Sequence, residues 1–187
     1  SDADIAAVFA ADDNGAAVTW NPPLMQCRNV KGAKLVFDSG RIPGEIIDLL
    51  VINTEVLAAN PALGKALVGA WYEIMGVMSG EGDTAVAAKT FMAEASGADL
   101  AGYEAQLAST EMFFTPDAAL ALTNSEKLVE TMKNVAEFSF KHGLLGDGAP
   151  DAGFIGIEMP AGTFGNADNV QFRFDPTYMQ MAADGKL

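Results

Sequence analysis

The stretch Ala16–Pro23 constrains the fold more than any other part of this 187-residue sequence. Its first five residues, Ala-Ala-Val-Thr-Trp, form an apolar run typical of a short buried β-strand. Asn21-Pro22-Pro23 must end that strand, because proline cannot donate to a ladder and keeps the preceding residue extended. Pro23 suits the first position of a helix, so helical turns are expected over Leu24–Arg28. This succession is typical of the carboxyl edge of an α/β sheet, where ligands usually bind.

Charge and composition exclude several classes of function. The chain has 25 acidic and 11 basic residues, a net charge of -14. That balance argues against nucleic acid and against anionic membrane surfaces as partners, although local donors can still hold a small anion. No run approaches the roughly 18 apolar residues of a membrane span. The single cysteine excludes an internal disulfide and a multi-thiolate metal site.

The remaining pattern predicts strands early in the chain and helices later. Two further buried strands are expected over 34–37 and 46–52, and a half-exposed strand over 170–174. Between them, residues 146–165 are rich in glycine and proline and predict a loop. Helices are expected over 3–11, 24–28, 61–78, 83–95, 99–107, 125–141 and 176–181.

Two of these helices have predicted inward faces. In 83–95 the inward residues are Val86, Phe91 and Met92. In 125–141 they are Leu128, Val129, Met132, Val135, Phe138 and Phe140.

Residue types that carry catalysis are scarce. His142 follows Lys141 and precedes Gly143 at a helix end, where a capping role is expected. Cys27 lies in a predicted apolar helix, and we expect it to be an inert buried thiol. Nucleophile-elbow, phosphate-loop and dinucleotide motifs are absent from the sequence. We therefore expect no catalytic residues, no metal and no cofactor.

A binding surface is the function that remains. Thr19, Trp20 and Asn21 follow one predicted strand, and Asp38 and Ser39 follow the next. Tryptophan offers a ring face to an apolar or cationic ligand, and asparagine offers an amide. Two plainer alternatives stay open: Trp20 is a core aromatic, or Asp38 and Ser39 belong to an ordinary turn.

The loop 40–45 follows directly and is a candidate to close over these residues. Its Glu45, or Asp38, would supply a counter-charge. An acidic cleft of this kind would favour a cation such as guanidinium, whereas a cleft of backbone amides at helix starts would favour an oxyanion.

Several motifs in order resemble a known family. They are Ser1–Ile5, Ala17–Pro22, Ile42–Asp48, Asn60–Leu67, Lys141–Leu145 and Phe172–Asp175. Together they resemble the solute-binding proteins of ABC transporters of the nitrate/sulfonate/taurine class, and within it the branch associated with urea carboxylase. The resemblance covers essentially the whole chain.

The resemblance implies an α/β fold like that of type II periplasmic binding proteins, here incomplete. Residues 1–52 would be the remainder of the second lobe with a hinge strand, and 53–187 the mostly helical carboxyl part of the first lobe. It further implies a periplasmic location, ABC transporter membrane subunits as partners, and a urea- or guanidine-like, or nitrate-, sulfonate- or taurine-like, solute held near Trp20 and Asn21. Because the chain opens at a helix cap without a signal segment, we expect it to be part of a longer protein.

Two other functions are alternatives to this one. An enzyme of the same bilobal fold, related to thiamin-pyrimidine synthesis, would depend on histidine and cysteine chemistry, and this chain has one of each. A sensory ligand-binding domain is the other alternative. We also expect two copies of the chain to form a homodimer, because missing strands would leave edges and apolar faces uncovered.

Overall fold

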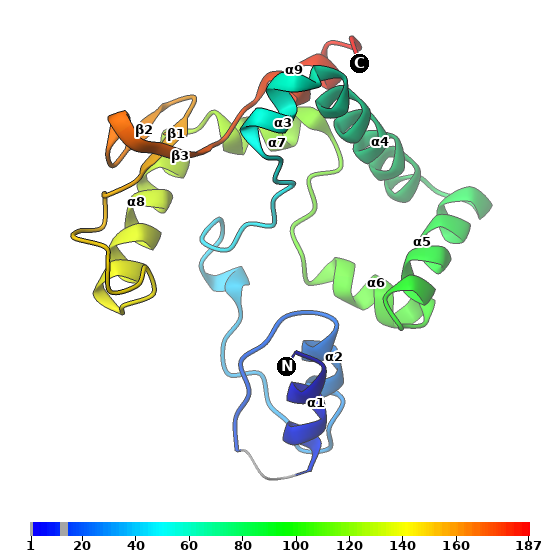
Figure 1. Ribbon diagram of the computed structural model, residues 1–187. Coiled ribbons are helices and arrows are strands. Elements are labelled where there is room, and N and C mark those ends of the chain that lie inside the picture. Colours follow the sequence, from blue (N-terminus) through cyan, green and yellow to red (C-terminus); the bar gives the residue numbers. More distant parts are fainter. Residues whose placement is uncertain (1, 12–14) are drawn as a thin grey trace. The chain divides into compact units, whose positions relative to one another are not determined.

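The computed structural model describes residues 2–11 and 15–187 and is mostly helical, with one small sheet (Figure 1). This confirms a mixed α/β chain. Contacts divide it into two compact units. Unit 1 comprises Ser1–Arg41 and Val77–Met112, and unit 2 comprises Ile42–Gly76 and Phe113–Leu187. The division between residues 52 and 53 expected from the sequence stays a prediction.

Unit 1 contains two pairs of packed helices. Its elements are α1 (Asp2–Ala10), α2 (Pro23–Arg28), the 3-10 helix η1 (Ser39–Arg41), α5 (Asp83–Ala95) and α6 (Leu100–Ala108). α1 packs on α2 and buries Ala6 and Cys27. α5 packs on α6, whose first turn is capped by Asp99 accepting from the Gly102 N–H. The expected helices over 3–11, 24–28, 83–95 and 99–107 are thus confirmed within a residue or two.

The predicted inward face of α5 is wrong. Ala85 and Ala93 are the buried residues of this helix, whereas Val86, Phe91 and Met92 are exposed. Residues eight apart lie on one face of a helix, and two alanines there let a neighbouring helix approach closely. The sequence-based choice of the largest apolar residues overlooked that small side chains also make packing faces.

Unit 2 contains most of the helical residues. Its helices are α3 (Thr54–Ala59), α4 (Pro61–Ser79, which ends in unit 1), α7 (Pro116–Thr123), α8 (Glu126–Lys141) and α9 (Thr177–Ala183). Side chains of Asn53, Thr115 and Ser125 cap α3, α7 and α8 by accepting backbone hydrogen bonds. The ring of Tyr178 lies against Gly64, where a Cβ would collide with it, so α4 and α9 pack closely.

The sheet has three short strands in the order β2-β1-β3. β1 (Gly156–Met159) pairs antiparallel with β2 (Gly162–Phe164) and parallel with β3 (Val170–Arg173). β3 confirms the half-exposed strand predicted over 170–174. β1 and β2 were predicted as loop, because glycine and proline in this region masked the short strands. The sheet and α8 together bury Met159 and Leu128.

The predicted inward face of α8 is correct only in its first half. Leu128 is 1% exposed and Thr131 is buried, and this half of α8 faces the sheet. Val135, Phe138 and Phe140 are exposed, which corrects their predicted burial. Figure 1 shows the reason: the carboxyl half of α8 extends beyond the strands it covers.

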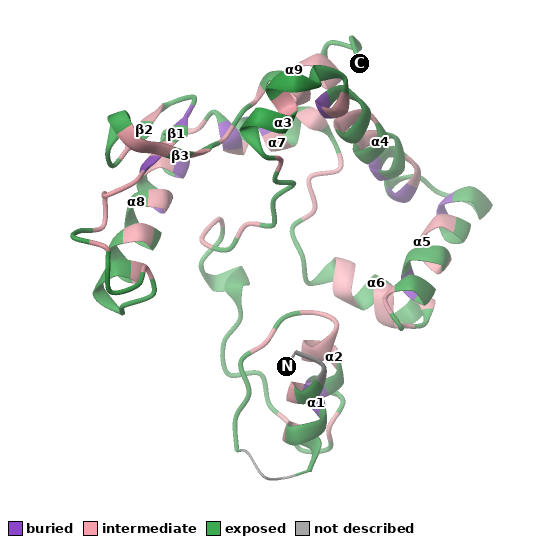
Figure 2. Cartoon of the chain, in the orientation of Figure 1, coloured by how far each residue is buried: buried purple, intermediate pink, exposed green. Residues whose placement is uncertain are grey.

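The three predicted buried strands, 16–20, 34–37 and 46–52, are not strands here; we call them the three extended segments. Among the described residues, none of the backbone groups of 16–19, 34–37 or 46–52 forms a backbone hydrogen bond. Val18, Val36 and Val51 are 96%, 84% and 66% exposed, and Figure 2 shows these regions mostly in green. A strand requires a neighbouring strand for its ladder, and the described chain places none beside them.

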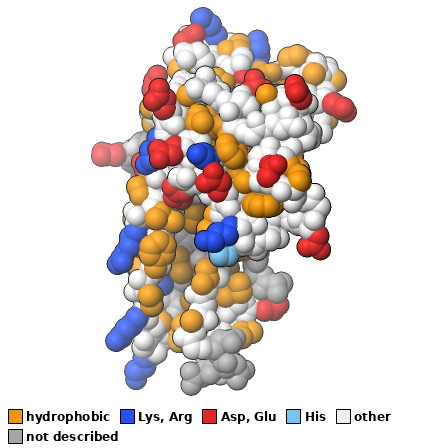
Figure 3. Space-filling view, turned by 90° about the vertical axis from the view of Figure 1, so that its left-hand side faces the viewer, with side chains coloured by type: hydrophobic (Ala, Val, Ile, Leu, Met, Phe, Trp, Pro, Cys, Tyr) orange, Lys and Arg blue, Asp and Glu red, His pale blue; other side chains and the backbone are white. Residues whose placement is uncertain are grey.

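Apolar side chains consequently occupy part of the surface. Figure 3 shows them on one face of the molecule, interspersed with acidic and basic groups. The described residues contain no helix that is long and apolar enough to cross a membrane.

Candidate functional site

Residues Thr19–Arg28, where the sequence predicts the end of a strand, a stop and a helix, form a compact corner in unit 1. The peptide bond between Asn21 and Pro22 is cis, and α2 begins directly afterwards. The corner is closed by two backbone hydrogen bonds, from Leu24 N to Trp20 O at 2.8 Å and from Met25 N to Pro22 O at 3.0 Å. The stop and the proline-led helix are confirmed, even though the preceding segment has no strand partner.

Asn21 is held by a residue far away in the sequence. Its amide nitrogen Nδ2 donates to Ser109 Oγ at 3.2 Å, and the Ser109 hydroxyl donates to Gln106 O at 2.8 Å. Because a serine hydroxyl has one hydrogen, and here it is used on Gln106, Ser109 can only accept from Asn21. This fixes which end of the Asn21 amide faces Ser109 and leaves Oδ1 directed elsewhere.

Two oxygen atoms at this corner have no hydrogen-bond partner in the part of the chain that the structure describes. Thr19 Oγ1 and Asn21 Oδ1 are both shielded from solvent, and neither forms a hydrogen bond with a described residue. An unsatisfied buried acceptor costs about 1–3 kcal/mol relative to a paired one. The corner would therefore be stabilised by a group that donates hydrogen bonds to these atoms.

Trp20 lies between these two residues and is 59% exposed. It is therefore not a core aromatic, which decides against one of the plainer alternatives. An exposed indole offers a surface on which a flat or cationic group can stack.

The other predicted binding residues are not joined to this corner by any interaction of the described chain. Asp38 is exposed at the end of an extended segment, and its carbonyl accepts from Arg41 N at 3.2 Å. Ser39 is exposed and begins η1. Glu45 is half-buried and belongs to unit 2. Whether these three residues act with Thr19, Trp20 and Asn21 stays a prediction.

Ser109 was missed by the sequence reasoning. It follows α6 directly and lies 88 residues from Asn21. A serine after a helix is common, and nothing in its local sequence distinguishes it. A contact between distant residues of this kind becomes visible only in the fold.

The two residues considered for catalysis lie in structural positions. His142 is the carboxyl-terminal cap of α8, and its ring packs on Phe138 with 4.3 Å between ring centroids. Gly143 follows in the left-handed region at φ 72°, so the predicted helix stop is confirmed. Cys27 is buried in α2, as predicted. The described residues contain no group of three or more His, Cys, Asp or Glu side chains that could hold a metal ion.

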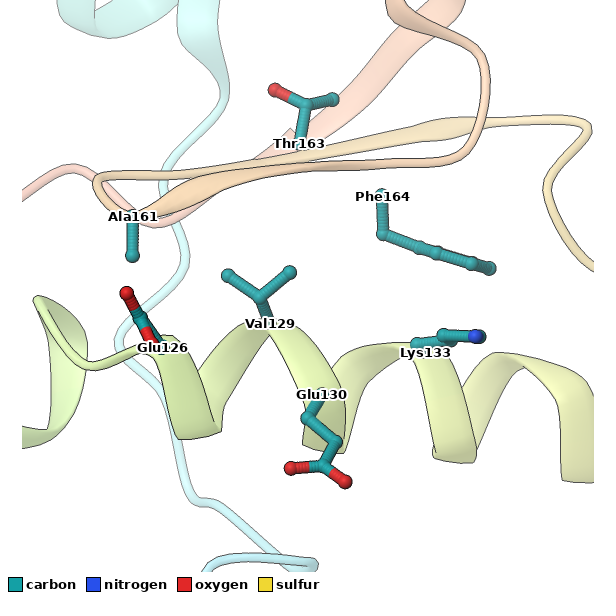
Figure 4. A pocket seen from close by; sticks show the side chains of 7 residues that line it. All are labelled: Glu126, Val129, Glu130, Lys133, Ala161, Thr163 and Phe164. Carbon is teal, nitrogen blue, oxygen red and sulfur yellow. The ribbon is translucent and has the colours of Figure 1, made fainter.

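A separate hollow of about 350 Å³ lies in unit 2 between α8 and the β1–β2 hairpin. Figure 4 shows Val129 and Phe164 facing each other across it, while Glu130 and Thr163 point away. A small-molecule site needs polar groups that converge on its ligand. Glu126 and Lys133 also line this hollow, but they lie at separate places along α8, and Lys133 pairs with Glu137. Because its polar groups do not meet at one point, we regard the hollow as a packing gap between the helix and the hairpin.

Comparison with known proteins identifies no relative of this chain. None of the protein-family models, curated proteins or solved structures that were searched matches the chain. The case for any function therefore depends on the residues themselves, and above all on the corner formed by Thr19, Trp20 and Asn21.

Proposed function

We propose that this chain belongs to the solute-binding component of an ABC importer and contributes to a site for a small polar solute. The ordered motifs that resemble the nitrate/sulfonate/taurine class, urea carboxylase-associated branch, support this proposal. The same resemblance supports a periplasmic location, membrane transporter subunits as partners, and a type II periplasmic binding fold in the complete site. The protein binds its solute and leaves it chemically unchanged.

The observation that carries the proposal is that Thr19 Oγ1 and Asn21 Oδ1 are buried without a hydrogen-bond partner among the described residues, with the exposed Trp20 between them in the sequence. Asn21 Oδ1 can only accept hydrogen bonds, and Thr19 Oγ1 can accept as well as donate. A solute that satisfies both must carry N–H or O–H donors. Urea and guanidinium are flat and rich in N–H groups, and guanidinium would also stack on Trp20. Nitrate and sulfonate oxygens are acceptors only and would leave Asn21 Oδ1 unpaired.

Transport would follow from the way the solute joins two lobes. A ligand that contacts both lobes stabilises the closed form and shifts the open–closed equilibrium towards it. The transporter then distinguishes closed from open protein. Residues 40–45, with Glu45, would contribute to that closure as the sequence predicts.

Thermal denaturation of the full-length protein tests the proposal. Urea and guanidinium at millimolar concentration should raise Tm, since a ligand at 100 times its Kd stabilises the native state by about 2.7 kcal/mol. Nitrate, taurine and alkylsulfonates are the comparison solutes. Asn21→Leu should abolish the shift, while the matched change Asn134→Leu on the exposed face of α8 should retain it.

Two outcomes would contradict the proposal. If none of these solutes shifts Tm, the corner is not a solute site. If the full-length protein consumes the solute that it binds, the enzyme alternative replaces the transport function. A shift with nitrate or sulfonate alone would retain transport but overturn the role given to Asn21 Oδ1.

A further inference from the structure

Residues 34–38 form a short extended stretch in which Asp38 O, which accepts from Arg41 N, is the one backbone group bonded to the described backbone. Lys34–Phe37 form no backbone hydrogen bond among the described residues, and Val36 is 84% exposed. The Lys34 and Asp38 side chains form neither hydrogen bonds nor ion pairs with the rest of the described chain. A strand with free backbone groups is a template for pairing with another chain.

The sequence of this stretch is complementary to itself in one direction only. In an antiparallel pair centred on Val36, Lys34 lies opposite Asp38 of the second copy, and Leu35 lies opposite Phe37. Side chains alternate between faces, so one face holds two ion pairs around a central valine pair. The other face holds four apolar side chains. In a parallel in-register pair, Lys34 would lie beside Lys34 and Asp38 beside Asp38, which is unfavourable.

The other two extended segments lack this property. Residues 16–20 contain no charged side chain. In 46–52 the only charge is Asp48, and an antiparallel self-pair places it either opposite an apolar residue or opposite another Asp48. Charge complementarity therefore distinguishes 34–38 from both.

We propose that two copies of this chain associate through antiparallel pairing of residues 34–38 about a two-fold axis at Val36. The second copy supplies the ladder partner that the described chain lacks. With a two-fold axis, the same patch of each copy contacts its equivalent in the other copy. No patch is left for a third copy, so the assembly is a dimer. The proposal is independent of the solute site, since the pairing requires no ligand.

Charge exchange provides the sharpest test, with sedimentation velocity as the readout. Lys34→Asp places like charges opposite each other at both ends of the pair, and so does Asp38→Lys. Because the two-fold axis doubles each change, either variant alone should weaken self-association about tenfold or more in Kd. An equimolar mixture of the two variants restores both ion pairs and should form a heterodimer. The double variant K34D/D38K should dimerise like the parent chain.

Matched controls separate strand pairing from net charge. Lys65→Asp and Asp147→Lys change the charge by the same amounts at exposed positions outside the stretch, and should leave the dimer intact. Circular dichroism checks that each variant retains its helices. A parent chain that is monomeric at every concentration overturns the proposal. So does a mixture that associates no better than its components, and so does an open series of larger species.

Engineered cysteines test the register. Val36 lies on the proposed axis, so Val36→Cys should form a disulfide-linked dimer under mild oxidation. Leu35→Cys should cross-link to Phe37→Cys in a mixture but far less to itself. Cys27 is buried, and the parent chain therefore serves as the uncross-linked control. Equal cross-linking of Leu35→Cys and Val36→Cys with themselves would overturn the two-fold register.

Discussion

The extended segment Lys34–Phe37 and the strand β3 contrast sharply although both are four residues long with strand-like sequences. β3 reads Val-Gln-Phe-Arg, pairs with β1 and alternates between half-buried and exposed residues. Lys34–Phe37 reads Lys-Leu-Val-Phe, is more apolar, and has no ladder partner among the described residues. The contrast shows that strand propensity indicates which residues are able to form a strand. They form one only where a neighbouring strand is available to pair with them.

The largest predicted effect is the loss of stability when an apolar side chain beneath the sheet is truncated, compared with the same change in an extended segment. Leu128→Ala, beneath the sheet at 1% exposure, should lower the free energy of unfolding of unit 2 by about 4 kcal/mol, because it leaves a cavity. Val18→Ala removes a side chain that is 96% exposed and should change stability by less than about 0.5 kcal/mol. Urea denaturation measures both. Comparable losses would show that the Val18 region is packed like the sheet.

The next effect tests how closely the backbone packs around the sheet. Gly165 has φ 81°, and a Cβ there would collide with the carbonyl oxygen of Ile155. Gly165→Ala should therefore cost about 3 kcal/mol, from strain and overpacking together. Gly146 has φ 83° with open space around it, so Gly146→Ala isolates the strain at about 1 kcal/mol. Equal costs in chemical denaturation would argue against the close approach at Gly165.

A smaller effect is expected at the start of α8. Ser125 Oγ accepts the Leu128 N–H at 3.2 Å, and Ser125→Ala should destabilise unit 2 by about 1 kcal/mol. Ser125→Asp preserves the acceptor and adds a charge that favours the helix start, so it should recover most of the loss. Thermal denaturation of the two variants measures this. An equal loss in both would show that the cap contributes little.

The smallest predicted effect is the cross-strand ion pair of the sheet. Arg173 Nε donates to Glu158 Oε2 at 2.9 Å, with side chains 44% and 53% exposed respectively. Exposed pairs of this kind contribute roughly 0.2–1 kcal/mol and weaken with salt. A double-mutant cycle with Arg173→Met and Glu158→Gln should give a coupling in this range that falls at high salt. A coupling unaffected by salt would contradict a solvent-screened pair.

Local signals in the sequence predicted most of the helices, but α7 was missed, because the stretch between Thr115-Pro116 and Asn124-Ser125 was expected to be a short turn. Ser125, Asp99 and Asn53 cap the helices that follow them, because a capping side chain acts within its own turn. The same holds for Gly143 after α8. Helical hydrogen bonds join residues four apart, so the sequence of one segment contains most of the information that its helix needs.

Features that depend on distant residues were not predictable in the same way. The three extended segments have strand-like sequences, yet their pairing depends on residues outside them. β1 was overlooked because its own composition does not indicate a strand. It forms a strand because β2 and β3 pair with it on either side. The corner at Trp20 and Asn21 was predicted from local stop signals, whereas its hydrogen bond to Ser109 was not.

Backbone amide hydrogen exchange tests the central claim most directly, namely that the three extended segments lack a ladder within one copy of the chain. At high dilution, the amides of Val18, Val36 and Val51 should exchange near their unprotected rates, whereas those of Ile157 and Phe172 should be protected. Protection at Val36 should then appear as concentration rises. Protection of Val18, Val36 and Val51 at high dilution, equal to that of β1, would contradict the account.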